Sequence, residues 1–104
     1  MALTKDFKDR VQSRAQRDVA FRRGLLIEAI ECLLNDDLET GKILIRDYIK
    51  ATIGFEALAE QTNMKPKSIM RSLSATGNPT SKNLFTILHS LQQREGLQFM
   101  VRAT

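Results

Sequence analysis

Residues 55–73 read Phe55-Glu-Ala-Leu-Ala-Glu-Gln-Thr-Asn-Met-Lys-Pro-Lys-Ser-Ile-Met-Arg-Ser-Leu73, and this stretch predicts two short helices joined by a tight turn. Leu58 and Ile69 are expected to point into the small core between the two helices. Asn63 falls in the turn, where it tolerates a left-handed backbone better than most residues other than glycine. Pro66 suits the first turn of the second helix, because its missing N–H is no loss there. This spacing is that of a helix-turn-helix.

The second helix of the pair is expected to present a basic, hydrogen-bonding face. Arg and Lys pair with the two acceptors on the guanine edge in the major groove of DNA. Lys67 and Arg71, with Ser68 beside them, are therefore the candidates for base readout. The same spacing also occurs in ordinary helical hairpins whose basic face is merely solvated, so the motif by itself leaves both interpretations open.

A loop and a further helix follow this pair. Residues 74–80, Ser74-Ala-Thr-Gly-Asn-Pro-Thr80, form a loop by composition, and the next helix is expected to run from a Thr80 or Ser81 cap to about Arg94. The N-terminus of a helix offers N–H donors to a phosphate, and such contacts set the register on DNA without reading its sequence. The candidate phosphate contacts are Lys65, Asn78, Thr80, Ser81 and Lys82.

Two longer helices are expected upstream, because apolar residues recur there at helical spacing. The first runs from an Asp18 cap to about Asn35, and the second runs from about residue 38 to residue 53, where Gly54 ends it. Residues 1–17 form a basic N-terminal arm that is either a short amphipathic helix or disordered until bound. Residues 18–104 are therefore expected to form one all-α domain of five helices.

The end of the chain has a different period. Leu97, Phe99 and Val101 alternate with Gln98, Met100 and Arg102, which is the period of a half-buried β-strand. A lone strand has no partner within a helical chain, and unpaired strand edges recruit other strands. We therefore expect a short C-terminal strand that pairs with a second subunit or a partner protein; the alternative is a short solvated tail.

Charge is spread unevenly along the 104 residues, whose formal net charge is +4. Residues 1–23 carry seven Lys/Arg and three Asp (+4), residues 24–54 carry three Lys/Arg and six Asp/Glu (−3), and residues 55–104 carry six Lys/Arg and three Glu (+3). The basic balance favours an anionic partner.

Cys32 is the only cysteine, so no internal disulfide can form, and it is expected to be a small buried residue. With no apolar stretch long enough for a bilayer, we expect a cytoplasmic protein without a membrane partner.

The sequence shows no recognisable set of catalytic residues. His89 is the only histidine, and it has no Cys or second His at ligand spacing, so it is expected to be a solvent-facing or partly buried helical residue. No Gly-rich phosphate loop is present, and no nucleophile, base and oxyanion donors assemble. We therefore expect a binding module that is not an enzyme and that uses no metal and no cofactor.

Three segments together resemble a known family, the HigA-like antitoxins, also called addiction-module antidote proteins. The segments are Gly54-Phe-Glu-Ala-Leu-Ala-Glu-Gln-Thr, Ser68-Ile-Met-Arg-Ser-Leu-Ser74 and Gly77-Asn-Pro-Thr80 with the leucine-rich helix after it. The resemblance spans roughly residues 18–102. It implies a five-helix helix-turn-helix domain of the Cro/phage-repressor (XRE) type, with the recognition helix on residues 65–73. Phe55 stands where many relatives of the wider superfamily have Gln, so a backbone contact made there by Gln is in doubt.

The resemblance also implies a biological role. Members of this family repress their own operon and neutralise a RelE/ParE-fold toxin in a type II toxin–antitoxin module. The first hypothesis is therefore a homodimeric repressor that binds double-stranded DNA at an inverted-repeat operator. The alternatives are a stand-alone transcriptional repressor, or a toxin-sequestering protein-interaction module with incidental DNA binding. In the last of these, the acidic residues 24–54 would complement a basic toxin surface.

Overall fold

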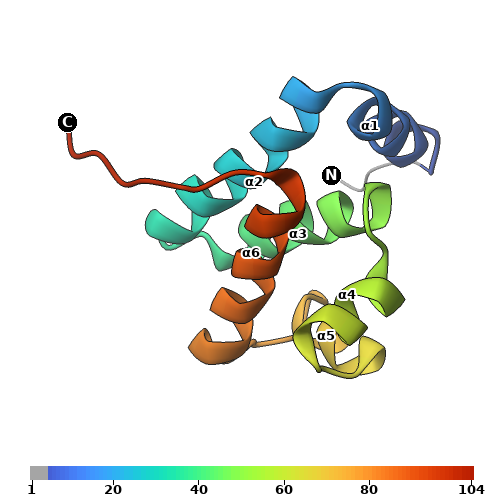
Figure 1. Cartoon of the computed structure of the whole chain (residues 1–104), viewed down its shortest axis with the longest axis vertical. Coiled ribbons are helices and arrows are strands. Elements are labelled where there is room, and N and C mark those ends of the chain that lie inside the picture. Colours follow the sequence, from blue (N-terminus) through green and yellow to red (C-terminus); the bar gives the residue numbers. More distant parts are fainter. Residues whose placement is uncertain (1–4) are drawn as a thin grey trace.

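The computed structural model of the chain describes residues 5–104, and its regular structure consists of α-helices (Figure 1). Their bounds are α1 Lys5–Arg17, α2 Val19–Leu34, α3 Leu38–Ala51, α4 Phe55–Thr62, α5 Pro66–Ser72 and α6 Ser81–Glu95. The all-α class is confirmed, and α2 to α6 correspond to the five helices that the apolar spacing predicts. The described part of the N-terminal arm is a sixth helix, while residues 1–4 of that arm lie outside the described residues.

Cap residues set the helix boundaries. The side-chain oxygens of Asp18, Asp37 and Thr80 each accept the backbone N–H three residues ahead at 3.1 Å, which satisfies one unpaired donor at the start of α2, α3 and α6. The caps at Asp18 and Thr80 are as predicted. Helix α3 ends at Ala51, two residues earlier than predicted; the N–H of Gly54 still donates to the carbonyl of Ile49 at 2.8 Å, and Gly54 also precedes α4 with a positive φ of 81°.

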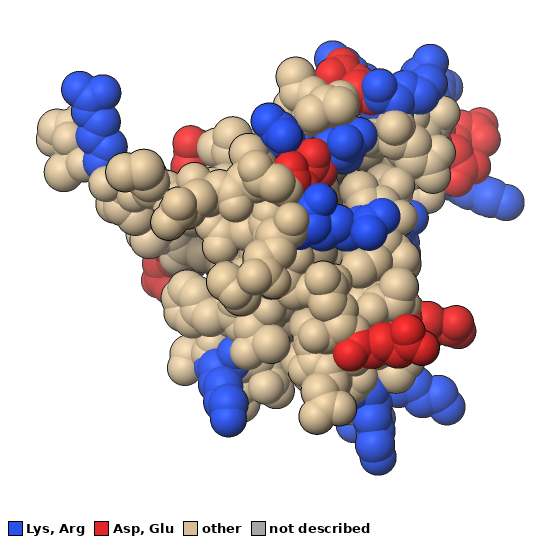
Figure 2. All heavy atoms as spheres, in the orientation of Figure 1, with Lys and Arg blue, Asp and Glu red and all other residues tan. Residues whose placement is uncertain are grey.

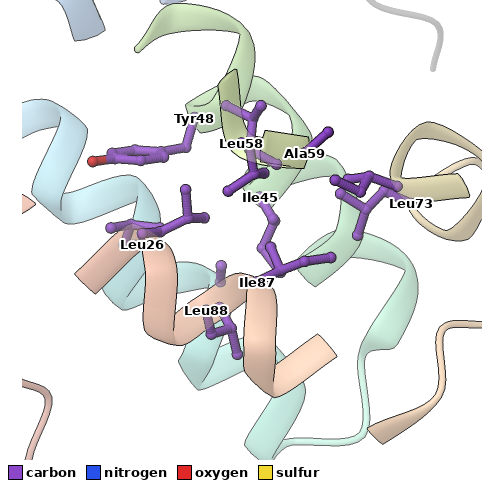
Figure 3. Close-up of a cluster of buried hydrophobic side chains, with 12 residues drawn as sticks. Leu26, Ile45, Tyr48, Leu58, Ala59, Leu73, Ile87 and Leu88 are labelled. Carbon is purple, nitrogen blue, oxygen red and sulfur yellow. The ribbon is translucent and has the colours of Figure 1, made fainter. Parts of the chain in front are cut away.

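The main core lies where α2 to α6 meet, and Figure 3 shows its side chains pointing toward one another. Leu and Ile supply most of it, as the scarcity of aromatic residues predicts. Burying each of these side chains contributes roughly 1.5–3 kcal/mol. The largest fully buried side chains are Tyr48, Leu26, Ile45, Ile49, Leu58, Ile69, Leu73, Ile87 and Leu91.

Helix α1 docks onto the domain through a second, smaller apolar cluster. Ala15 of α1 is completely buried beside Leu25 of α2 and Ala51 of α3. The guanidinium of Arg14 lies 4.5 Å from the ring centroid of Phe21, which is a cation–π contact between α1 and α2. The described part of the basic arm is therefore packed against the domain and does not form a separate unit.

The predicted C-terminal strand is not formed within the described chain. The segment 97–104 runs as extended chain away from the end of α6 (Figure 1). The N–H of Leu97 donates to the carbonyl of Gln92 at 3.0 Å, and the N–H of Phe99 donates to Oε1 of Gln92 at 2.6 Å. Phe99 packs against the main core, whereas Val101 is 87% exposed. Only Phe99 of the alternating residues thus packs on the main core, and the segment forms no strand because a strand needs a partner strand that the single chain does not supply.

Three further expectations concern membrane spanning, Cys32 and His89. None of the helices described over residues 5–104 is long and apolar enough to cross a bilayer. Cys32 is half-buried on α2, so the expectation of full burial is wrong. Its partial withdrawal from water and its acidic neighbours, Asp37 first among them, raise the pKa of the thiol. His89 is exposed on α6, as expected.

Candidate nucleic-acid interface

Helices α4 and α5 form a tight pair at one end of the molecule, at the lower right of Figure 1. Leu58 and Ile69 are completely buried between them and the core, as predicted, and Ala59 is 4% exposed where the helices pack closely. Asn63 connects the pair in the left-handed region with φ 56° and ψ 34°, and Pro66 opens α5, so both sequence expectations for the turn are confirmed.

The outer face of α5 carries the residues predicted for base readout. Lys67, Ser68 and Arg71 are all exposed, while Ile69 anchors the opposite face of the helix in the core. Met70, which is outside the predicted set, is also 42% exposed on this helix. An apolar side chain there suits contact with a thymine methyl group.

The start of α6 lies at the same end of the molecule as α5 (Figure 1). The predicted phosphate contacts Lys65, Asn78, Thr80, Ser81 and Lys82 are all exposed. The N–H groups of Ser81 and Lys82 precede the first intrahelical bond, which is the one from Leu84 to Thr80 at 2.9 Å. These donors and the positive end of the helix dipole face solvent, as an anion-binding helix terminus requires.

Basic side chains predominate around α5 and the start of α6. From Gln61 to Arg94 the chain carries five Lys/Arg and no Asp or Glu. Figure 2 shows the Lys and Arg side chains spreading outward at the lower end, with acidic side chains above them toward α4. Helix α4 carries two exposed acidic residues, Glu56 and Glu60. A field of one sign over a surface attracts a polyanion and supports its rapid association.

A buried lysine holds the loop between α5 and α6. Lys42 of α3 is only 4% exposed, and its Nζ donates to the carbonyls of Ser74 at 2.9 Å, Ala75 at 3.4 Å and Gly77 at 2.6 Å. An ammonium group has three donors, and here all three are used. The loop therefore owes its shape to a residue more than thirty positions away, which is a contact that local sequence does not reveal.

A second cation of α3 and a glycine complete this arrangement. Nη1 of Arg46 donates to the carbonyl of Leu73 at 3.1 Å. A Cβ on Gly77 would collide with the carbonyl oxygen of Arg71, so only glycine fits where the loop passes the end of α5. Both cations also offset the negative end of the α5 dipole.

One signal in the sequence points to Lys42. It precedes Ile45 by three residues and Ile49 by seven, so it shares their inward face of α3. A lysine within an apolar stripe predicts a buried cation that needs acceptors. Its acceptors are backbone carbonyls, which carry no residue-type signature, so the sequence identifies the donor and not its partners.

A buried charge cluster occupies the opposite end of α6. The carboxylate of Glu95 accepts hydrogen bonds from Nε of Arg22 at 2.8 Å, from Nε of Arg23 at 3.4 Å and from the hydroxyl of Tyr48 at 2.5 Å. Burial by itself would raise the pKa of Glu95, but the bonds from Arg22 and Tyr48 outweigh burial, and the pKa is lowered. This cluster ties α2, α3 and α6 together and lies away from α5.

Within residues 5–104, no three His, Cys, Asp or Glu side chains come together in a way that could hold a metal ion. No family model, no curated protein and no solved structure matches this chain.

Proposed function

We propose that this protein is a sequence-specific DNA-binding regulator of transcription and not an enzyme. The observation that carries the proposal is the shared placement of an exposed basic helix, α5, and the N-terminus of α6 at one end of the molecule, without a carboxylate from Gln61 to Arg94. In a helix-turn-helix protein the second helix of the pair enters the major groove, while neighbouring elements hold the backbone.

Side-chain chemistry assigns base readout and phosphate binding to different residues. Arg71 and Lys67 reach guanine edges, and Ser68 adds a hydrogen bond to a base or phosphate. The five predicted phosphate contacts hold the duplex in register and carry no sequence information. They are Lys65, Asn78, Thr80, Ser81 and Lys82. In this arrangement α4 packs behind α5 and presents it to the groove.

The biological role is proposed from the resemblance to HigA-like antitoxins. In that role the protein is cytoplasmic, represses its own operon as a homodimer at an inverted repeat, and neutralises a RelE/ParE-fold toxin. An apolar groove of about 490 Å³ between α2, α6 and the C-terminal segment supports a protein partner on that face. Leu34, Phe85 and Val101 line it with exposed fractions of 69%, 66% and 87%. Exposed apolar surface of this kind marks interaction sites.

The direct test of the DNA-binding proposal is selection from a random duplex library with the purified protein, followed by sequencing of the bound DNA. We expect enrichment of one motif in two inverted copies. Recovery of sequences without a shared motif would contradict sequence-specific recognition. A toxin-sized gene beside this one would favour the antitoxin role, and its absence would favour a stand-alone repressor.

The first variant concerns base readout. Arg71→Ala should weaken binding to the selected duplex by roughly 1–3 kcal/mol and relax the preference at one base pair, because alanine cannot make the bidentate bond to guanine. Fluorescence anisotropy with the selected duplex and its single-base variants measures both effects. The matched control is Arg10→Ala on the exposed face of α1, which lies away from α5 and should bind as the wild type does. Unchanged binding by Arg71→Ala would show that α5 does not read bases.

The second variant concerns the phosphate contacts. Lys82→Ala should weaken binding to every duplex alike and lower the slope of log K against log salt by about one, since one fewer phosphate is neutralised. Salt titrations with the selected duplex and with a mixed-sequence duplex give the two slopes. A loss confined to the selected duplex would assign Lys82 to base readout instead.

A further inference from the structure

We infer that Lys42 is a positioning residue for DNA binding: from inside the fold, it sets the loop that brings the start of α6 onto the phosphate backbone. The inference rests on the proposed function and goes beyond it, because Lys42 is itself 4% exposed and cannot touch DNA. Its role is exerted through the loop at residues 74–77, whose carbonyls it binds.

The loop has little else to define its shape. Within residues 74–77 the described backbone bonds are those from Ser74 to Arg71 at 3.2 Å and from Gly77 to Ser74 at 3.0 Å. The three carbonyls that point at Lys42 would repel one another without a cation between them. A buried ammonium with all three donors engaged therefore fixes their relative positions, and hydrogen bonds to a charged group are stronger than neutral ones.

The loop in turn fixes the candidate phosphate contacts. Asn78 follows Gly77 directly, and Thr80 caps α6 at the end of the same segment. α5 ends at Ser72 and α6 begins at Ser81, so the intervening loop sets the positions of Asn78 and of the Thr80 cap. A loop that relaxes would leave α5 in the core through Ile69 and the body of α6 through Ile87, but it would displace Asn78 and loosen the first turn of α6.

Lys42 is suited to this role by its place in the fold. It lies on α3, whose Ile45 and Ile49 are completely buried in the main core, so the backbone that carries Lys42 is held firmly. Arg46, one turn further along α3, binds the carbonyl of Leu73 at the end of α5. The two side chains thus tie both ends of the connection to one rigid helix, and misplacement by even an ångström weakens contacts that depend on geometry.

A double-mutant cycle distinguishes positioning from a merely structural role. The variants are Lys42→Met, which keeps the length of the side chain and removes its donors, Lys82→Ala and the combination. The probe is a fluorescently labelled mixed-sequence duplex, because phosphate contacts do not depend on sequence. We expect Lys42→Met to weaken binding about ten-fold, the size of one charge-assisted hydrogen bond, and to lower the salt slope by about 0.9 for each phosphate that the variant no longer neutralises.

The decisive quantity is the coupling between the two residues. In the Lys42→Met background, Lys82→Ala should cost less than half as much affinity as in the wild type, because the side chain of Lys82 is already misplaced. Lys65→Ala is the matched control: Lys65 precedes α5, away from the loop, and its loss should be the same in both backgrounds. Lys42→Arg should recover most of the affinity, since it restores a cationic donor.

Each outcome bears on the inference. A folded Lys42→Met protein that binds with wild-type affinity and salt slope overturns it but leaves the proposed function standing. Equal losses for Lys82→Ala in both backgrounds also overturn it. A wild type that shows no salt-dependent binding to the duplex overturns the proposed function and this role with it. If Lys42→Met does not fold, Arg46→Met takes its place in the cycle, with an expected loss of about three-fold for its single carbonyl bond.

Discussion

Glu95→Ala should lower the free energy of unfolding by roughly 1–3 kcal/mol at neutral pH, because the buried hydroxyl of Tyr48 and the guanidinium of Arg22 lose their acceptor. The Glu95 side chain is 5% exposed, whereas those of Arg22 and Arg23 are 24% and 40% exposed and stay partly hydrated, and Arg23 keeps its bond to the backbone carbonyl of Glu95. Tyr48 is completely buried, and its hydroxyl donates to the carboxylate of Glu95 in the wild type. For a domain whose total stability is roughly 5–15 kcal/mol, such a loss is a sizeable fraction of the total.

Urea unfolding at pH 7 measures this effect. The matched control is Glu60→Ala: Glu60 is an exposed glutamate on α4, and its replacement should change stability by less than about 0.5 kcal/mol. A Glu95→Ala protein as stable as the Glu60→Ala protein would show that the cluster contributes nothing net. The double variant Arg22→Met, Glu95→Leu should be closer to the wild type than Glu95→Ala is, because it removes charge on both sides.

The same cluster makes stability depend on pH. The pKa of Glu95 is lower in the folded protein than in the unfolded chain, so its contribution is complete above the unfolded pKa and is lost as the pH falls through the folded pKa. The Thr40 hydroxyl and N–H lower the pKa of Asp37 and add to the same trend. Wild-type stability should therefore fall on acidification, and it should fall less in Glu95→Ala, as urea titrations across the acid range would show.

Removal of residues 100–104 should convert a dimer into a folded monomer and reduce affinity for the selected duplex by about 10²–10⁴, since a monomer cannot engage the linked second half-site. Met100 and Val101 are each 87% exposed, beside an apolar groove in the same chain. This deletion leaves the N–H groups of Leu97 and Phe99 bound to Gln92, so the body of the protein keeps its contacts.

Sedimentation analysis at micromolar concentration decides the oligomeric state. Removal of residues 103–104 alone is the matched control and should leave the dimer intact, because Ala103 and Thr104 add little apolar surface. If the protein without residues 100–104 remains a dimer, the interface lies on the helices. A monomeric wild type would leave the groove to a toxin or another partner protein.

Much of this fold could be predicted from the sequence because its determinants act over a few residues. The caps at Asp18 and Thr80 bind N–H groups three residues ahead. Asn63 and Pro66 shape the turn and the start of α5 through their own backbone preferences. The apolar spacing places α2 to α6 correctly within a few residues, since a helix needs one buried face.

The exposed face of α5 is predictable for the same reason. Once Leu58 and Ile69 are assigned to the core, helical geometry places Lys67, Ser68 and Arg71 outward, and the structure agrees with that exposure. Their proposed contacts with DNA stay a prediction. The predicted C-terminal strand is not formed in the single chain, because its backbone groups need a partner strand, and its pairing with a second subunit or another protein stays a prediction.

By itself, then, the sequence determined the helices, their caps, the turn before α5 and the basic character of its outer face, because each depends on neighbours within about one helical turn. Only the tertiary structure decided how Lys42 shapes the loop before α6, with a bond to Gly77 across 35 positions. It also decided that Glu95 pairs with Arg22 across 73 positions. Such contacts join residues whose approach depends on the packing of whole helices, and several of their acceptors are backbone carbonyls that every residue possesses.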